Sequence, residues 1–286
     1  MELLPGSPFN DEKLNEAQKA LLRAKYGLDQ PFWTRFFLYL KNLCHGDFGV
    51  SYVITMDLPV RDMLLLRLPV TIRIGLQALT AGILIGLVLG IIAALNKNSA
   101  ADTGATIFSV LGFSVPSYVF ALLLAFFVGY KMKWFPILYD VRSPFLSSVL
   151  PTISLSMYII ATMARYARSE MIDCLSSNYI VLAKAKGISQ AKVIIRHALR
   201  NTLVPIITVV APLTIGLITG SVVVEQIFGV PGLGQLLLLG VQNNDYNVIC
   251  AVALVYSFLY IFIMLTVDIL YGLIDPRIRV AGGDTK

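Results

Sequence analysis

The sequence predicts an all-α, polytopic membrane protein, and three observations support this fold class. Hydrophobic residues make up 57% of the chain and charged residues only 14%, whereas soluble domains have roughly 45–50% and about 25%. Long apolar runs recur along the chain, and the Lys and Arg residues gather in alternate segments between those runs. The composition excludes a disordered chain, a collagen-like fibre and an ordinary cytosolic enzyme.

Five apolar runs approach or exceed the length of about 20 residues that a helix needs to cross a bilayer. The predicted spans are residues 74–95, 107–128, 149–168, 203–224 and 248–270. The third run is the shortest, because Arg165 follows only 16 residues after its start. It crosses the bilayer if Arg165 and Arg168 extend their charged heads to the interface. A re-entrant or buried piece is the alternative.

The Lys and Arg residues between the runs predict the orientation. The segment 165–200 carries seven of them, and the loop 226–247 carries none. Alternate loops carry eleven on one side and three on the other, and the richer side is expected to be cytoplasmic. Residues 1–68 are therefore expected outside the membrane and the tail 276–286 inside, with a membrane domain over residues 69–275.

The segment 1–68 contains no apolar run long enough to span a bilayer, although it is expected to be exported. No signal peptide explains its export, because Met1 is followed by neither a basic n-region nor a long apolar h-region. We therefore expect a further span upstream of Met1, either because the assigned start is late or because the chain is truncated.

Small residues and prolines mark particular helices. Small residues recur every four positions in the first span, at Ala78, Gly82, Gly86, Gly90 and Ala94. Such a face lets another helix approach closely, and it predicts packing within the bundle, with a contact between subunits as the alternative. Pro116 interrupts the second span, and Pro205 and Pro212 should bend the fourth.

Several chemistries have no support in the sequence. The chain lacks the phosphate-binding pattern G-x-x-x-x-G-K-[ST] and the H-E-x-x-H and G-x-S-x-G patterns of hydrolases. Cys44 and His45 form an adjacent pair, but a metal site needs more ligands. Cys174 and Cys250 are interpreted as ordinary small apolar residues. We predict no catalytic residue, no cofactor, no metal site and no nucleic-acid partner.

The cytoplasmic loop 169–202 carries the main functional signal. Residues 179–186 favour a helix, and Gly187 suits the left-handed position that follows a helix end. Ser189 suits the N-cap of a second helix that runs towards Asn201. Two short helices with a hinge are therefore predicted at the inner membrane surface. On composition alone, a basic amphipathic connector that lies on lipid is the alternative.

The sequence of this loop resembles that of a known family. Y-I-V-L-A-K-A-K-G-I-S at 179–189 and R-H-A-L-R-N-T-L-V-P at 196–205 resemble the coupling loop of binding-protein-dependent ABC importers. More narrowly, they resemble the B-type permease subunit of oligopeptide/dipeptide importers. Ala183 and Gly187 match the last Ala and the Gly of the E-A-A-x-x-x-G motif, whereas Val181 and Leu182 replace its Glu and first Ala.

The resemblance extends over nearly the whole chain. It includes L-L-P-G-S-P-F at 3–9, G-D-F-G-V-S at 46–51, G-F-S-V-P-S-Y at 112–118, V-V-V-E-Q-I-F-G-V-P-G-L-G at 222–234 and V-D-I-L-Y-G-L-I-D-P-R-I-R at 267–279. The match begins just after the first span of the family, in agreement with the helix expected upstream. The resemblance implies a type I ABC importer transmembrane domain in the bacterial plasma (inner) membrane.

The resemblance also implies partners and a coupling role for the loop. The implied partners are a second homologous permease subunit, two cytosolic ATP-binding subunits, an extracytoplasmic substrate-binding protein and the lipid bilayer. The implied contacts to the ATPase are Tyr179, Leu182, Ala183, Lys184, Lys186, Gly187 and Ile188. Peptide is the implied substrate, and nickel, metal–chelator complexes and glutathione are the alternatives. A membrane scaffold or sensor that does not transport is an alternative of a different class.

The outer loop 226–246 has no Lys or Arg and is apolar and rich in turn residues. We expect it to fold back into the mouth of the path, buried in protein as irregular backbone at membrane depth requires. A plain surface loop is the alternative. The expected gate or loop residues are Glu225, Phe228, Pro231, Gly232, Leu233 and Gly234.

Overall fold

The computed structural model describes residues 29–274, together with residues 17, 21, 24 and 27. Within this part of the chain, the regular elements are all helical. In chain order they are α2 (Phe32–Cys44), α3 (Val60–Leu95), α4 (Ala100–Ser114), α5 (Ser117–Leu124), the π-helix η1 (Ala125–Lys131), α6 (Pro144–Ser147), α7 (Val149–Leu175), α8 (Asn178–Ala185), α9 (Gln190–Lys192), the π-helix η2 (Val193–Ala198), α10 (Leu199–Ile227), α11 (Leu233–Gln242) and α12 (Tyr246–Ile274). The predicted tail 276–286 lies outside the described residues.

The chain divides into two compact units, each formed by two stretches of sequence. The first unit comprises residues 1–72 and 230–258, and the second comprises residues 73–229 and 259–286. Helices α3 and α12 each contribute to both units.

The core of the first unit joins the start of α3 to α11 and to the start of α12. Its buried residues are Val60, Met63, Leu64, Leu233, Leu236, Val248, Ala251 and Val252. At the edge of this core, the backbone N–H of Leu233 donates to Thr71 Oγ1 at 2.8 Å. Val60, Met63 and Leu64, three and four positions apart on α3, therefore face the short helix α11. The sequence pattern did not separate this helix from the loop around it.

A buried carboxylate orders the loop that precedes α3 in the first unit. Asp245 Oδ2 accepts hydrogen bonds from Ser51 Oγ at 2.6 Å and from the backbone N–H groups of Tyr52 and Val53 at 3.0 Å each. The nearby Asn247 Nδ2 donates to the Val50 carbonyl at 2.9 Å. The start of α12 therefore holds a turn almost two hundred residues earlier in the sequence.

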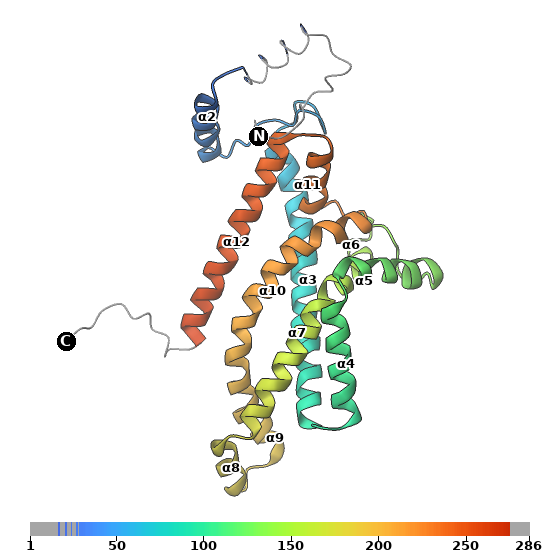
Figure 1. Cartoon of the computed structure of the whole chain (residues 1–286), viewed down its shortest axis with the longest axis vertical. Coiled ribbons are helices and arrows are strands. Elements are labelled where there is room, and N and C mark those ends of the chain that lie inside the picture. Colours follow the sequence, from blue (N-terminus) through green and yellow to red (C-terminus); the bar gives the residue numbers. More distant parts are fainter. Residues whose placement is uncertain (1–16, 18–20, 22–23, 25–26, 28, 275–286) are drawn as a thin grey trace, which may run out of the picture. The chain divides into compact units, whose positions relative to one another are not determined.

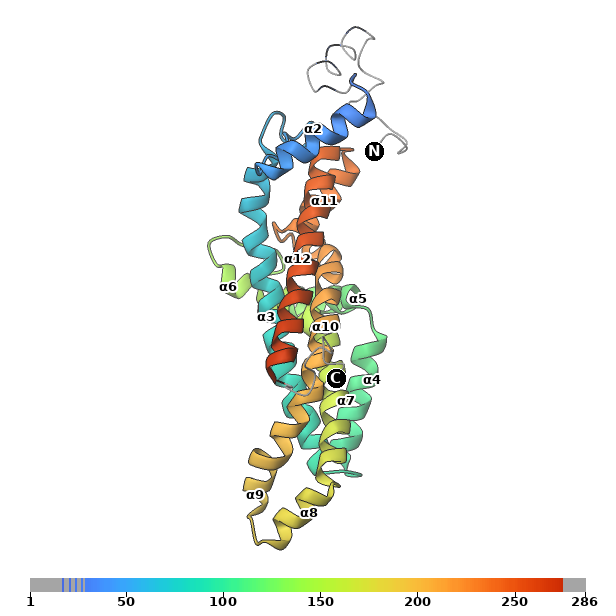
Figure 2. The same ribbon diagram turned by 90° about the vertical axis from the view of Figure 1, so that its left-hand side faces the viewer.

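In the second unit, α7 is the central helix. It packs against α4, α5 and α10, and both views show α4 returning beside the end of α3 while α8 and α9 lie at the ends of α7 and α10 (Figures 1 and 2). Some of its hydroxyl groups bond within the helix, as when Ser154 Oγ donates to the Leu150 carbonyl at 2.8 Å. A helix enclosed by other helices can carry such residues without exposing them to lipid.

The face of small residues on α3 packs against α7 inside the chain. A Cβ added at Gly82 would lie 2.6 Å from the side chain of Ile159, and one added at Gly86 would lie 2.6 Å from Met163 Cβ. At Gly90 the α7 backbone is equally close, because the Ala164 carbonyl would lie 2.5 Å from the added atom. This agrees with the prediction of packing within the bundle, and these glycines let the two helix backbones approach closely.

Two unbroken helices among the described residues are long and apolar enough to cross a membrane, Val60–Leu95 and Tyr246–Ile269. Two bent pairs also qualify if each pair is one span, Ala100–Ser114 with Ser117–Lys131 and Gln190–Leu203 with Thr208–Thr214. The first of these helices starts well before the predicted span, at Val60. Charged residues such as Arg67 and Arg73 delimit an apolar run in the sequence, but they do not end a helix.

Candidate functional site

The predicted coupling loop is a helical hairpin formed by α8, a tight turn and α9–η2. Ser177 precedes α8 and Ser189 precedes α9, both in extended conformation. Between them Gly187 has a φ of +74°, and its N–H donates to the Lys184 carbonyl at 2.9 Å. This left-handed turn is the one that the sequence predicts at Gly187, and it reverses the chain so that η2 packs against α8.

Helix α8 has two different faces. Ile180 and Ala183 are buried, at 0% and 6% exposure. Tyr179 and Leu182 are exposed by 42% and 56%, and Val181 beside them is exposed as well. The basic residues predicted for steering, Lys184 and Lys186, are exposed too, as is Gly187, while Ile188 is half-buried.

Ala183 lies on the buried face of α8. Its side chain lies in a core that also contains Ala94, Met171, Val193 and Ala198. Ala183 therefore faces its own chain in this structure, and the contact with the ATPase that the resemblance implies for it stays a prediction. Its small size suits this close-packed core, to which the ends of α3 and α7 also contribute.

A chain of polar contacts closes the base of the hairpin. Tyr179 Oη lies 2.6 Å from Cys174 Sγ and accepts a hydrogen bond from Asn201 Nδ2 at 3.0 Å. Cys174 Sγ in turn donates to the Ala198 carbonyl at 3.4 Å. Sequence reasoning treated Cys174 as a plain apolar residue, because nothing local indicates that residues 174, 179 and 201 meet.

An ion pair joins α4 to α7 in the same region. Arg168 donates to both carboxylate oxygens of Asp102, at 2.5 and 2.9 Å. Asp102 lies in the first turn of α4, before the predicted span 107–128. The charge of Arg168 is therefore paired within the protein, and its expected position at the membrane interface stays a prediction.

Two of the three prolines expected to interrupt or bend helices lie at changes of helix direction. Pro116 stands between α4 and the α5–η1 pair, whose axes differ by 104°. In α10, the helix directions on either side of Pro205 differ by 48°, and Thr208 Oγ1 donates to the Pro205 carbonyl at 2.7 Å. Pro212 also lies within α10. Proline removes one backbone donor, so the carbonyl four residues before it loses its usual helical partner.

The residues expected at an outer gate belong to two different units of the chain. Glu225 and Phe228 belong to the second unit and are buried, at 1% and 0% exposure. Residues 231–234 belong to the first unit, where Gly232, Leu233 and Gly234 are buried and Pro231 is half-buried. Residues 233–242 form the helix α11 and not an irregular loop. A gating role for this segment stays a prediction.

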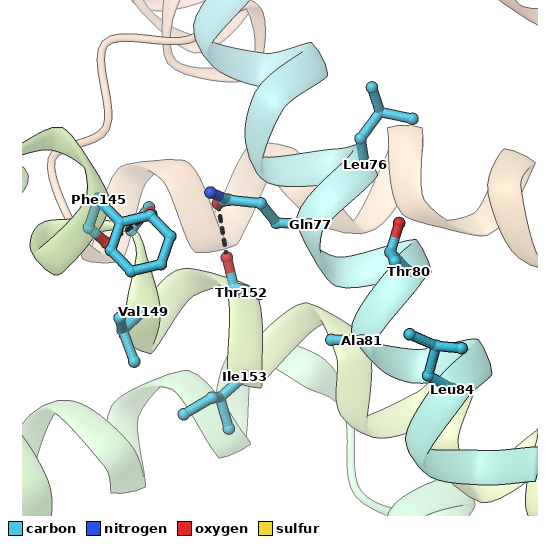
Figure 3. A pocket seen from close by; sticks show the side chains of 10 residues that line it. Leu76, Gln77, Thr80, Ala81, Leu84, Phe145, Val149, Thr152 and Ile153 are labelled. Carbon is cyan, nitrogen blue, oxygen red and sulfur yellow. Dashed lines mark hydrogen bonds between the residues drawn. The ribbon is translucent and has the colours of Figure 1, made fainter.

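The second unit also carries a groove of about 520 Å³ that the sequence did not indicate (Figure 3). The residues that line it, from α3, α6 and α7 and their junctions, are Leu76, Gln77, Thr80, Ala81, Leu84, Phe145, Ser148, Val149, Thr152 and Ile153. Thr152 Oγ1 donates to Gln77 Oε1 at 3.2 Å. The remaining lining is largely apolar, which suits contact with another helix or with lipid better than recognition of a charged ligand.

The arrangement is that of a helical membrane protein with a packed hairpin between two long helices, and its fold is that of the type I ABC importer transmembrane domain. The structure matches one of the MetNI methionine ABC transporter in an inward-facing conformation, with a TM-score of 0.59 at 15% identity over 74% of this chain and 96% of that one. An amino acid ABC transporter solved with histidines matches with a TM-score of 0.57 at 16% identity, over 73% and 93% of the two chains.

The family follows from sequence comparison. The model of the family described as binding-protein-dependent transport system inner membrane component matches residues 86–280. The dipeptide transport system permease DppB of Bacillus subtilis is 42% identical over 98% of this chain and 90% of its own length. DppB of Lactococcus lactis and the oligopeptide permease OppB of Haemophilus influenzae are 41% and 40% identical, each over 98% of this chain and 91% of its own.

The chain belongs to this family of inner-membrane transport components, which confirms the resemblance found in the sequence. It is a multi-pass membrane protein and a permease component of an ABC transporter.

Proposed function

We propose that this permease forms, together with a second homologous permease subunit, a translocation path for peptides. ATP hydrolysis on two separate cytosolic subunits drives transport, and an extracytoplasmic binding protein delivers the substrate. The peptide assignment is supported by the relatives, which are named as dipeptide and oligopeptide permeases and match over almost the whole chain.

The observation that carries the coupling role is the two-sided character of α8. Its inner face is fixed in a core with residues of α3, α7 and η2, whereas Leu182 and Val181 on its outer face are exposed by 56% and 59%. Exposed apolar side chains next to Lys184 and Lys186 suit a protein groove that excludes water and carries acidic groups at its rim. We infer that the ATPase docks on this outer face.

The packing also suggests how motion passes from the hairpin to the long helices. Met171 of α7 and Val193 of η2 share one core with Ile180 of α8. Because cores are close-packed, displacement of α8 displaces the end of α7 and the start of α10 with it. The bend at Pro205 then allows the part of α10 after the proline to move differently from the part before it.

Uptake measurements in cells that lack other peptide importers test the proposal. With all partner subunits present, import of a labelled peptide should depend on this permease and stop when the ATPase subunits are catalytically inactive. Uptake of nickel, a metal chelate or glutathione without peptide uptake would instead favour those substrates. Stable expression without any uptake would favour a scaffold or sensor.

A further inference from the structure

A second hollow in the second unit, of about 420 Å³, opens where α4, α7 and α10 meet. Its lining residues are Phe113, Tyr158, Thr162, Arg165, Tyr166, Thr208, Val209, Pro212 and Leu213. Polar groups contribute a larger share of this lining than of the lining of the groove at Gln77 in Figure 3. The hollow also adjoins the bent part of α10, next to Pro212.

Arg165 supplies a cation to the hollow. Its guanidinium carbon lies 5.3 Å from the ring centre of Phe113 and 5.6 Å from that of Tyr166. Among the described residues, no carboxylate forms an ion pair with Arg165, although Arg168, one turn further along α7, is paired with Asp102. Arg165 lies near the end of the predicted span 149–168 and is exposed in this chain, so its guanidinium is available to a ligand.

Thr162 supplies an unused hydroxyl on the same helix, one turn before Arg165. The residue is 5% exposed, and its Oγ1 has no hydrogen-bond partner in the described part of the chain. Most buried hydroxyls are satisfied, and a helical threonine usually bonds a carbonyl of the preceding turn, as Thr202 does with the Ala198 carbonyl at 3.0 Å. A hydroxyl left open beside an unpaired guanidinium points to an acceptor that enters the hollow.

We propose that this hollow is a subsite for the C-terminal carboxylate of a peptide in transit, an inference that rests on the proposed function. The planar guanidinium of Arg165 can donate two parallel hydrogen bonds to a carboxylate, and the Thr162 hydroxyl can donate a third. The rings of Phe113 and Tyr166 hold the guanidinium by cation–π contact and leave its donor edge for the ligand. The subsite recognises a group that every linear peptide carries, whatever its side chains.

The test compares a labelled tripeptide that has a free C-terminal carboxylate with the same tripeptide as its amide. Both are supplied at concentrations that saturate the binding protein, and initial uptake rates are normalised to the amount of permease in the membrane. Any preference of the binding protein itself is common to all permease variants. It therefore cancels when the acid-to-amide ratio of a variant is divided by that of the unchanged permease.

Arg165→Gln should lower the acid-to-amide ratio about tenfold, the size expected for loss of a charge-assisted hydrogen bond. Arg165→Lys should lower the acid-to-amide ratio less than Arg165→Gln does, and Thr162→Val should also lower it by a smaller factor. The control is Arg142→Gln, which removes an exposed arginine outside the hollow and should leave the ratio unchanged.

An unchanged ratio in Arg165→Gln would overturn the subsite, whether uptake of both peptides falls equally or stays normal. Equal loss would assign Arg165 to a lipid headgroup or to a carboxylate of the partner permease. If the unchanged permease imports neither peptide while its complex is intact, the proposed function itself fails, and the subsite fails with it.

Discussion

Asp102 and Arg168 form a two-point ion pair that joins the first turn of α4 to the last third of α7, with nitrogen–oxygen distances of 2.5 and 2.9 Å. Asp102 also accepts the backbone N–H of Asn98 at 2.9 Å. The carboxylate therefore fixes the turn between α3 and α4 as well as the position of α7. Because Met171 of α7 belongs to the hairpin core, the pair connects α4 to the helix end on which the hairpin is built.

Removal of this pair should weaken the support of the hairpin. Asp102→Asn keeps the size of the side chain but loses its charge, so we expect a lower thermal unfolding midpoint of the purified complex and slower peptide uptake. Arg168→Lys should act in the same direction, because an ammonium does not reproduce the two-point contact. Asp173→Asn is the matched control, since Asp173 is an exposed acidic residue on the same helix. Equal effects of the Asp102 and Asp173 variants would contradict the role of the pair.

The close contact between α3 and α7 predicts that substitutions of two glycines of α3 differ strongly in their effect on stability. Gly86→Val should destabilise the protein by about 1–3 kcal/mol or more through overpacking, because the new side chain meets Met163 and the Ile160 carbonyl. Gly75→Val should have little effect, since nothing lies within 4 Å of a Cβ at that position. Thermal unfolding of the purified protein measures both. Similar midpoints for the two variants would mean that the helices do not approach as described.

The fold was predictable where a signal is local in the sequence. The turn at Gly187 follows from a helix-forming stretch and one glycine, and the packing face of α3 follows from small residues four positions apart. The start of α3 was not predictable from hydropathy, because Arg67 and Arg73 delimit the apolar run without ending the helix. The helix α11 was missed because its glycines and the preceding Pro231 indicate turns.

The candidate site was predictable in position but not in orientation. Residues 179–188 stand out from the sequence, yet the side of α8 that faces inward depends on Met171 and Ala94, which are distant along the chain. The Asp102–Arg168 pair spans 66 residues, and the contact between Cys174 and Tyr179 depends on how α7 ends. The residues that line the hollow at Arg165 come from three helices, so they meet only when those helices pack together.

The predicted orientation places Cys44 outside the cell, and Cys44 is exposed in the structure. A maleimide that cannot cross membranes should therefore label the chain in intact spheroplasts, and Cys44→Ser should remove most of that labelling. Cys174 is only partly exposed, and its neighbouring hairpin is expected in the cytoplasm, so it should react only after the membrane is opened. Labelling of Cys44 only in inside-out vesicles would reverse the topology.

The left-handed turn at Gly187 predicts a difference between two substitutions of that residue. Gly187→Val places a β-branched residue at a φ of +74°, which costs of order 1–2 kcal/mol. Gly187→Asn should be tolerated better, since asparagine adopts this conformation more readily. We expect the valine variant to lose ATPase co-purification and peptide uptake while the asparagine variant keeps most of both. Because no atom lies within 4 Å of a Cβ at this glycine, steric contact within the chain cannot account for such a difference.

The two faces of α8 predict that substitutions of two neighbouring residues impair the permease in different ways. Ala183→Trp inserts a large ring into the hairpin core, so the amount of folded protein should fall and all functions should fall with it. Leu182→Asp changes only an exposed side chain, so the permease should reach the membrane in normal amounts. Loss of the burial of one leucine, about 1.5–3 kcal/mol, would weaken ATPase association roughly tenfold or more.

Co-purification of the ATPase with tagged permease and uptake in the same cells separate docking from lipid contact. Val141→Asp is the matched control, because Val141 is 76% exposed in a loop that is predicted to lie on the other side of the membrane. If α8 only lies on lipid, Leu182→Asp should leave ATPase association intact, because no protein groove is disturbed. A selective loss of association in Leu182→Asp, with normal association in Val141→Asp, places the ATPase contact on the outer face of α8.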